Sequence, residues 1–321
     1  MKRRHNQQGF TLIELIVALG LGLFMVAGVV LVFVQNNRSA TQDEELARVL
    51  ENGRFVMRVL TRELAMSNFW GKFLDIETTT NHASANVGTD CGDGVNPWAL
   101  DLGGLEFLPD VTPATVAANF ACLPNTDVVP STDILVVKRV ADSETADADL
   151  TANRLYLRTN GVAGQMFLGG AASTPPSLTG TETNWAYNPQ IYYIRDYSVQ
   201  TSDGIPTFCR AYLTVDASPD MENECLVEGV ENFQIEFGVD QDGDFVAEYF
   251  TATPTADELF DSVSARIYLM VRSVNPVPGY TNDKTYTLGS TTVVANDSFY
   301  RRVFTSSVVL RNPANLTGLD S

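Results

Sequence analysis

The chain has 321 residues and a formal net charge of −18, because 39 acidic side chains stand against 21 basic ones. An acidic surface repels phosphate, so the composition argues against direct nucleic acid binding by the whole protein. Only two histidines occur, which makes a histidine-based catalytic triad or a multi-histidine metal site hard to build. We therefore expect a protein that is not an enzyme, with a chain long enough to bury a sizeable core.

The first element is a basic leader followed by a long apolar run. Lysine and arginine stand at positions 2–4, Gly9 and Phe10 follow, and the run continues over 10–34. A helix of that length crosses a hydrocarbon core of about 30 Å. Glu14 is the one charge in the run, and a charge inside a membrane costs ~2.5–3.5 kcal/mol, so such residues are usually kept for a function. Because the basic residues come first, we expect the leader in the cytoplasm and the rest of the chain outside it.

Two plainer interpretations of this segment remain open. An ordinary secretory signal peptide would need small residues for cleavage just after the apolar run, where the polar residues 35–38 stand instead. An uncleaved membrane anchor would explain the length of the run, but it gives no reason for Gly9, Phe10 or Glu14.

Residues 7–16, Gln-Gln-Gly-Phe-Thr-Leu-Ile-Glu-Leu-Ile, resemble the class III leader and cleavage site of type IV prepilins and type II secretion pseudopilins. The resemblance implies that a prepilin peptidase removes residues 1–9 by cutting after Gly9, and that the new amine of Phe10 is methylated. It also implies that Glu14 pairs with the terminal amine of a neighbouring subunit during assembly. An opposite charge is the natural compensation for a carboxylate in lipid.

The second segment, 35–68, continues with helical spacing. Apolar residues recur at intervals of three and four, and no proline occurs between residues 10 and 96. Glu44 and Arg48, and likewise Glu51 and Arg54, stand at spacings that allow ion pairs on a helix. We predict one helix over about 11–68, with a membrane half and an amphipathic half that packs on a sheet.

The third segment, 69–189, is rich in Gly, Ala, Thr, Asn and Asp and predicts a loop-rich αβ insertion. Two strands are expected within it, over 134–140 and 154–159, and loops over 71–97 and 169–189. Loops on a rigid scaffold are common binding surfaces, although these could equally wrap the sheet. An exposed aromatic cluster would favour binding, and its candidates are Trp98, Phe107, Phe120 and Trp185.

The last segment, 190–321, predicts an antiparallel β-sheet. Alternating, β-branched or aromatic runs indicate strands over 191–199, 208–215, 230–239, 246–251, 263–274, 284–288 and 300–310. Residues 241–244 read as a hairpin turn, and 255–261 as a short helix or turn. The expected fold class is therefore α+β, a pilin-like long N-terminal helix packed on an antiparallel sheet.

Four cysteines occur, at positions 91, 122, 209 and 225. An even number in an exported chain predicts two disulfides, for which three pairings are possible. We favour Cys91 with Cys122 and Cys209 with Cys225, because each bond would then close one local loop.

One candidate metal site stands out, and no other cofactor is expected. Asp240, Asp242 and Asp244 alternate along a predicted turn, with Glu248 nearby, and oxygen ligands in this pattern suit calcium. The segment departs from an EF-hand loop, because its sixth residue is phenylalanine rather than glycine and its twelfth is threonine rather than glutamate. The alternative is a hairpin turn whose acids cap their own backbone.

Residues 226–240 and 301–312 are similar to the PilW minor pilins. That similarity implies a minor pilin that helps to start a type IV pilus with other minor and major pilins, and that sits at the fibre tip. It implies a single pass through the inner membrane with the C-terminal domain in the periplasm, and a place in the fibre after assembly. A minor pseudopilin of type II secretion, or a tip adhesin that binds through residues 70–189, are the alternatives.

Overall fold

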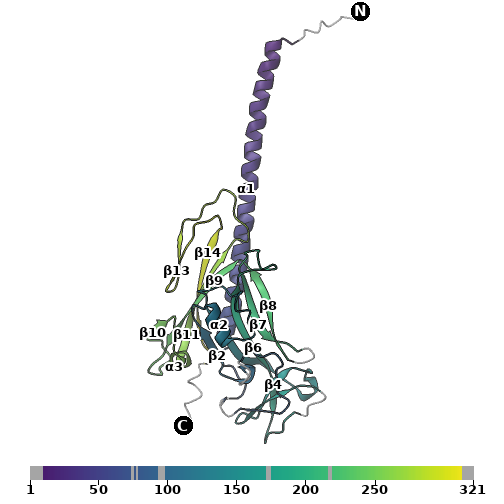
Figure 1. The fold of residues 1–321 in the computed structure, drawn as a ribbon, viewed down its shortest axis with the longest axis vertical. Coiled ribbons are helices and arrows are strands. Elements are labelled where there is room, and N and C mark those ends of the chain that lie inside the picture. The colour runs from purple at the N-terminus through teal and green to yellow at the C-terminus, as the bar shows by residue number, and fades with distance from the viewer. Residues whose placement is uncertain are drawn as a thin grey trace, which may run out of the picture.

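The computed structural model describes residues 10–73, 76, 79–92, 98–170, 175–215 and 219–312. The predicted leader, with Gly9, lies outside these residues. A single long helix projects from a β-rich domain (Figure 1).

Helix α1 spans Leu12–Ala65, 54 residues, which confirms the predicted helix. Thr11 caps its start, and Met66 ends it just before Asn68, whose positive φ of 57° turns the chain away. Every residue from Phe10 to Glu44 is exposed, whereas the second half of α1 buries one face against the domain.

Two main sheets make up the domain. Among the described residues, the larger has eight strands: β1 (Thr80–Asn81), β2 (Leu105–Leu108), β3 (Ile134–Thr145), β4 (Leu155–Thr159), β5 (Gly164–Leu168), β6 (Thr183–Arg195), β7 (Thr207–Leu213) and β8 (Met221–Glu228). The smaller has the order β10 (Tyr249–Thr251), β9 (Val230–Val239), β11 (Ser262–Arg272) and β14 (Arg301–Val309). A separate hairpin pairs β12 (Thr285–Leu288) with β13 (Thr291–Val294). The named strands pair antiparallel except for β1 with β5.

Short helices fill the connections. They are α2 (Pro113–Asn119), α3 (Ala256–Phe260) and two 3-10 turns, η2 (Trp98–Leu100) and η3 (Asp147–Asp149). Helix α3 confirms the short helix expected over 255–261, since Thr255 caps it through the backbone N–H of Glu258.

The predicted loop over 169–189 is wrong from Thr183 onward, because those residues form the first half of β6. Consequently β6 crosses the expected boundary at 189/190, and the two segments share one sheet. Pro189 made this stretch look like a loop. Pro189 pairs with Lys138 of β3 on one side of β6. On the other side, the pairing of β6 with β4 stops at Ala186, and its pairing with β7 starts at Gln190. Proline lacks an N–H, and here it stands where the ladder on that side is interrupted.

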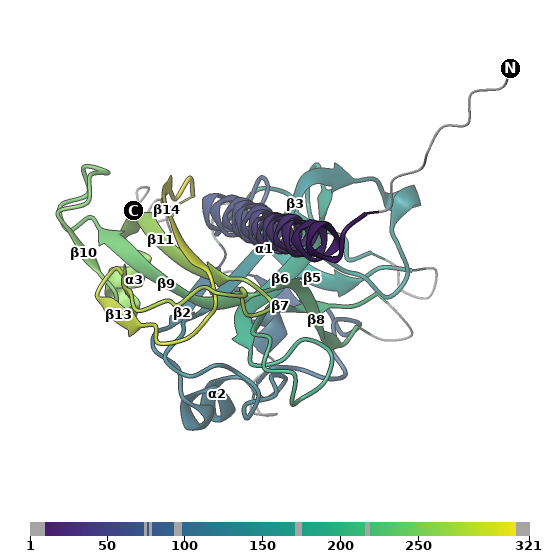
Figure 2. The ribbon, with the colours of Figure 1, turned by 90° about the horizontal axis from the view of Figure 1, so that it is seen from above.

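The main core lies where α1 meets both sheets. Seen from above, α1 lies along one face of the domain, with β11 and β14 on one side of it and strands of the larger sheet on the other (Figure 2). One apolar cluster joins α1 to both sheets, and it includes Val56, Leu60, Leu135, Ile194, Phe233, Ile267 and Val308. Ring contacts also join the sheets, since the Phe107 and Phe237 centroids lie 5.0 Å apart.

A buried ion pair fixes α1 to the larger sheet. The Arg139 guanidinium donates two hydrogen bonds to the Glu63 carboxylate, at 2.8 and 2.9 Å, and both side chains are buried. Such a two-bond geometry compensates both charges where water is excluded.

Candidate functional sites

The first candidate site is the start of α1. Glu14 Oε2 accepts hydrogen bonds from the Thr11 backbone N–H (2.9 Å) and from the Thr11 hydroxyl (2.8 Å), while the Glu14 N–H donates to the Thr11 hydroxyl (3.4 Å). This is a capping box, in which the acid satisfies backbone donors that the first turn leaves unpaired. Glu14 therefore stabilises its own helix end through one oxygen, a role that the sequence analysis missed although the Thr-x-x-Glu spacing signals it.

The half of α1 that follows Glu14 is long and apolar enough to cross a membrane. Phe10, which lies directly before the helix, is 90% exposed. The domain leaves this half of the helix uncovered, so its apolar surface needs lipid or other subunits as a partner.

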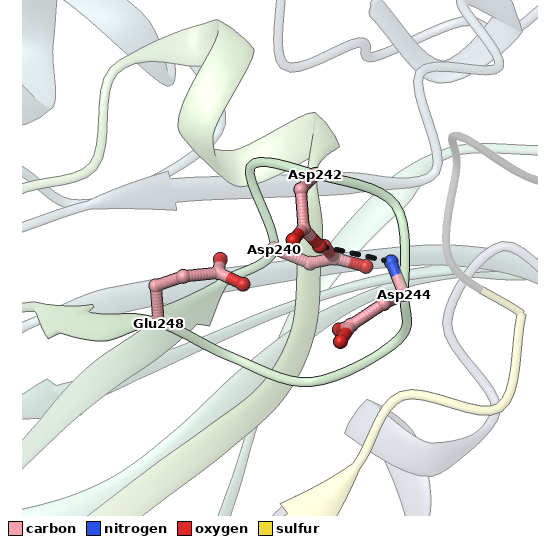
Figure 3. Close-up of side chains that lie close together, drawn as sticks. All are labelled: Asp240, Asp242, Asp244 and Glu248. Carbon is pink, nitrogen blue, oxygen red and sulfur yellow. Dashed lines mark hydrogen bonds between the residues drawn. The ribbon is translucent and has the colours of Figure 1, made fainter.

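The second candidate site is the acidic loop between β9 and β10. Ligand atoms of Asp240, Asp242, Asp244 and Glu248 all lie within 4.8 Å of one another (Figure 3). Asp240 is buried, and its two carboxylate oxygens accept the N–H groups of Gly243 and Phe245, each at 2.7 Å. The other three acids are exposed. The structure thus brings together Asp240, Asp242 and Asp244, which the sequence predicted as calcium ligands, and places Glu248 beside them.

The backbone conformation of Phe245 is relevant to the absence of the glycine that EF-hand loops have at their sixth position. Phe245 occupies the sixth position and has a φ of 65°, in the left-handed region that glycine takes at that position in EF-hands. A bulky residue in this conformation is uncommon and needs support from its surroundings. Here its N–H is fixed by Asp240. The loop therefore adopts left-handed backbone at its sixth position without a glycine there.

Both disulfides form, in the pairing that we favoured. Cys91 bonds to Cys122, and Cys209 bonds to Cys225 across the neighbouring strands β7 and β8. Both disulfides lie on the face of the larger sheet that points away from α1. Val116 and Tyr193 pack in the same cluster.

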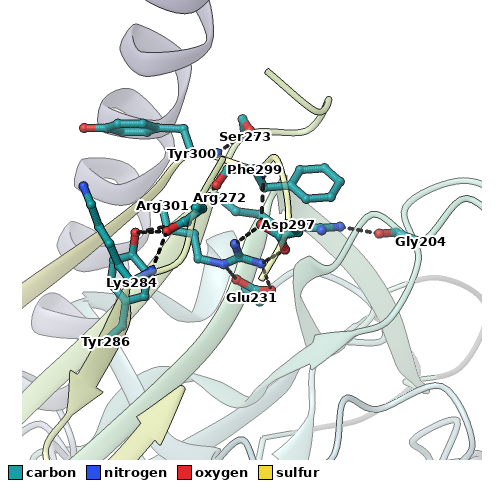
Figure 4. Close-up of polar contacts among 11 residues, drawn as sticks. Gly204, Glu231, Arg272, Ser273, Lys284, Tyr286, Asp297, Phe299, Tyr300 and Arg301 are labelled. Carbon is teal, nitrogen blue, oxygen red and sulfur yellow. Dashed lines mark hydrogen bonds and ion pairs between the residues drawn. The ribbon is translucent and has the colours of Figure 1, made fainter. Parts of the chain in front are cut away.

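A polar network around β14, which the sequence analysis missed, fixes the chain between β11 and β14. Arg301 donates to both carboxylate oxygens of Glu231, at 2.6 and 2.9 Å, and to both of Asp297, each at 2.7 Å (Figure 4). Burial lowers the pKa of Arg301, but its bonds to the two carboxylates outweigh burial and raise that pKa above its ordinary value. Arg272 stacks on Phe299, 4.0 Å from the ring centroid. The network has a structural role, because the Arg301 guanidinium joins the carboxylates of Glu231 and Asp297 by four hydrogen bonds.

The aromatic residues proposed for a binding surface are largely packed. Phe120 and Trp185 are buried, and Trp98 lies edge-on to Phe120 at 6.3 Å. Phe107 contacts the core between the sheets. These four residues therefore serve packing in the structure.

His82 gives no sign of a catalytic site. Its Nδ1 accepts the N–H of Ser84 at 3.2 Å and lies 2.8 Å from the Ser84 hydroxyl, a local turn contact. Among the residues that the structure describes, no carboxylate hydrogen-bonds this ring to orient it.

Comparison with protein families gives two matches. Residues 4–30 match the prokaryotic N-terminal methylation motif, and residues 191–312 match the family described as type IV pilus-assembly protein W. The first covers the predicted cleavage site and Glu14. The second begins within β6 and includes the acidic loop and the Arg301 network.

Comparison with solved structures gives a type IV-like pilin from Thermus thermophilus. It is 12% identical, with a TM-score of 0.35, and the similarity covers 83% of this chain and 98% of that one. A comparison with curated proteins finds no match.

Proposed function

We propose that this chain, a pilin-like protein similar to the pilus-assembly protein W family, is a minor pilin that helps to start a type IV pilus. The proposal rests on two features that occur together in this chain. A methylation motif opens an uncovered apolar helix, and that helix is continuous with a domain whose C-terminal part matches the family. A prepilin peptidase and other minor and major pilins are then its partners, and priming or capping the fibre is its role rather than catalysis.

The same features support a location in the inner membrane, with the domain in the periplasm. The apolar half of α1 anchors the chain in the inner membrane, with the basic leader in the cytoplasm and the domain in the periplasm. Two disulfides are consistent with that oxidising compartment. Intact mass and N-terminal sequence of the membrane-bound protein test this: we expect a chain that begins at N-methylated Phe10. A chain that keeps residues 1–9 would reduce it to an anchored periplasmic protein.

Glu14 is assigned the contact with the neighbouring subunit. Its capping bonds use Oε2, so Oε1 keeps its lone pairs and the carboxylate keeps its charge for a neighbour's terminal amine. Capping and assembly are separable, because glutamine can still accept the Thr11 bonds but carries no charge.

Three variants test this assignment in a strain whose pili depend on this subunit. Glu14→Gln and Glu14→Ala should both insert in the membrane and reduce pili at least tenfold. Thr11→Ala removes the hydroxyl of the cap but keeps the backbone N–H and the Glu14 carboxylate, so pili should remain near normal. Normal piliation with Glu14→Gln, with loss only in Glu14→Ala, would mean that Glu14 is only a helix cap. Loss of secretion with intact pili would favour the pseudopilin alternative.

We also propose calcium binding at the loop of Asp240, Asp242, Asp244 and Glu248. Its support is the convergence of four carboxylates on a turn with left-handed backbone at Phe245. Calcium would compensate the negative charges of the four carboxylates, which otherwise repel each other, and would stabilise the β9–β10 hairpin.

Thermal unfolding of the full chain in detergent measures this. A ligand at 100 times its Kd stabilises the fold by about 2.7 kcal/mol, so calcium should raise the Tm and a chelator should lower it. The Asp242→Asn/Asp244→Asn variant should lose the shift, whereas Asp283→Asn, an exposed acid elsewhere, should keep it. An unchanged Tm would leave the loop a self-capped hairpin turn.

A further inference from the structure

In the second half of α1, acidic and basic residues on the exposed face occupy different parts of the helix. At about 100° per residue, Asp43, Glu51, Arg54, Arg58 and Arg62 fall within one arc of about 100°. All five are solvent-accessible. The residues of α1 that the domain buries, such as Val56 and Leu60, lie on the opposite side. Acids thus stand nearer the membrane and arginines farther from it, on a face that the domain leaves free.

None of these five side chains has an ion-pair partner in the part of the chain that the structure describes. Glu44, which shares the face, is paired with Arg48 at 3.3 Å, whereas Glu51 forms no ion pair with Arg54. Phe55 lies beside the arginines and is 44% exposed. Two acids, three arginines and an aromatic ring on one helix face are therefore left to solvent in the single subunit.

Membrane lipid cannot satisfy the arginines. Arg54 lies 20 residues beyond position 34, where the apolar run ends. At 1.5 Å per residue this places it about 30 Å from the end of the run, and Arg62 farther still. Surface fields of a membrane fade within a Debye length of about 8 Å at physiological salt. A charged partner for these arginines would therefore be another molecule at the same height.

We propose that this face docks against the same face of a second copy of this chain, parallel to it and displaced along the helix by about 11 residues. The proposal rests on the proposed function, since two subunits anchored by the same apolar half of α1, inserted in the same direction, must stand parallel in the membrane. Without displacement, acid would face acid and arginine would face arginine. A shift of 11 residues brings Asp43 of one copy opposite Arg54 of the other, and Glu51 opposite Arg62.

The displacement suits the geometry of the helix. Eleven residues make about three turns, so the same face still points at the partner, and the rise is about 16 Å. The domain lies on the other side of α1 and does not obstruct the approach. The charge pattern therefore disfavours level subunits in the membrane and favours one subunit raised relative to its neighbour, as extrusion of a fibre requires.

Cross-linking in the native membrane tests the register. Ala47→Cys in one tagged copy and Arg58→Cys in a second should form a 47–58 disulfide, because these positions face each other at the 11-residue shift. That product should exceed the 47–47 and 58–58 products at least tenfold. Equal or greater 47–47 cross-linking would indicate level subunits and overturn the proposal, and so would the absence of any cross-link between copies.

Charge reversal tests the cause. Asp43→Arg/Glu51→Arg, added to the copy that carries Ala47→Cys, should reduce the 47–58 product at least fivefold. Arg54→Glu/Arg62→Glu, added to the copy that carries Arg58→Cys, should restore it. Arg302→Glu, an exposed arginine on β14, is the control and should leave the product unchanged.

A cross-link that ignores these reversals contradicts the proposal. Processing at Phe10 and pilus number are scored in the same strains. Unprocessed chain would count against the proposed function, whereas normal pili without the 47–58 product would count against this contact alone.

Discussion

At the scale of single residues, the domain depends on a few buried charges whose partners come from distant parts of the chain. Glu63 and Arg139 are 76 positions apart, yet they form a two-bond pair between α1 and β3. Neither charge could be buried alone without a large desolvation penalty. Helix and sheet are thereby held in one relative position.

Removing one partner of this pair should therefore be costly. Glu63→Gln keeps the shape but leaves the Arg139 charge uncompensated, and we expect it to lower the free energy of unfolding by about 3–5 kcal/mol. Urea unfolding of the full chain in detergent measures the change. Glu44→Gln, which breaks only the exposed pair with Arg48, should cost no more than about 1 kcal/mol. Equal effects of the two variants would contradict the distinction.

Asp133 makes the stability depend on pH. It lies where β3 begins beside β9, and its carboxylate accepts the N–H groups of Asp110 (3.0 Å) and Ile235 (2.8 Å). Burial nevertheless dominates and raises its pKa from 3.8 to about 8. The folded state therefore favours the protonated acid, so this stability is complete below about pH 4 and is lost as the pH rises through about 8.

We accordingly expect the Tm of the wild-type chain to fall between pH 5 and 8.5 by more than that of Asp133→Asn, which cannot ionise. Differential scanning calorimetry across that range compares the two. Parallel curves would mean that Asp133 stays ionised in the fold.

Local signals let the sequence predict some of these residues but not others. The acidic loop and the cysteine pairing both depend on residues close together in sequence. So do the cleavage site and the assembly role of Glu14, which stay predictions. The bonds of Glu63 with Arg139, and of Arg301 with Glu231, join positions about 70 or more apart, and a single sequence holds no signal for them.

At the scale of elements, α1 packs tightly against the smaller sheet at Gly53. A Cβ added there would lie 2.2 Å from the ring of Phe304 on β14. The absent side chain is what lets helix and strand pack at this distance.

Gly53→Ala should thus destabilise the domain although alanine favours helices. We expect a net loss of about 1–2 kcal/mol, since overpacking typically costs 1–3 and alanine returns up to about 1. Chemical unfolding measures it. At Gly28, where nothing lies within 4 Å, alanine should not destabilise the chain, and a similar loss there would point to a general effect on the helix.

The two disulfides constrain the unfolded chain more than they shape the native one. Cys209 and Cys225 are 16 positions apart, and replacing both with serine should lower stability by roughly 3 kcal/mol by loop-closure entropy. Cys91 and Cys122, 31 apart, should cost slightly more. Protease resistance of the two double-serine variants gives the ranking, and wild type with and without reductant gives the combined effect. Unchanged resistance on reduction would contradict a stabilising role.

Prediction of the elements succeeded where pattern and burial agree. Strand β9 was expected over its observed residues, and β11, β12 and β14 within two residues at each end, because buried and part-buried side chains alternate or run together along them. Strand β8 was missed because its exposed acids follow no strand pattern, and tertiary pairing with β7 outweighs local preference. The first half of β6 was missed because Asn184, Asn188 and Pro189 are residues typical of loops. They are extended here because β6 pairs with the neighbouring strands β3 and β4.

At the scale of the whole molecule, the two sheets and α1 share a core, so they should unfold together. Leu60 is fully buried where α1 meets both sheets. Leu60→Ala should cost about 2–5 kcal/mol and lower one common transition. Tryptophan fluorescence reports the larger sheet, against which Trp70 and Trp185 pack, and hydrogen exchange of β11 amides reports the smaller. Separate transitions would indicate two independent units.

The α+β class was predictable from the order of one helix followed by strands. The division into two sheets was not, because it depends on which strands pair, and β6, β7 and β8 turn out to join the strands of the middle segment rather than β9. The match of residues 191–312 to one family therefore spans parts of both sheets.

The unbroken run of α1 has a mechanical consequence. It continues for 54 residues, about 80 Å at 1.5 Å per residue, without a proline from end to end. Its far end is clamped by Glu63 and by Gly53 against Phe304, so no hinge separates the clamp from the anchor. A force that lifts the membrane half of α1 must therefore lift the domain by the same amount and at the same moment, because the helix transmits the movement rigidly.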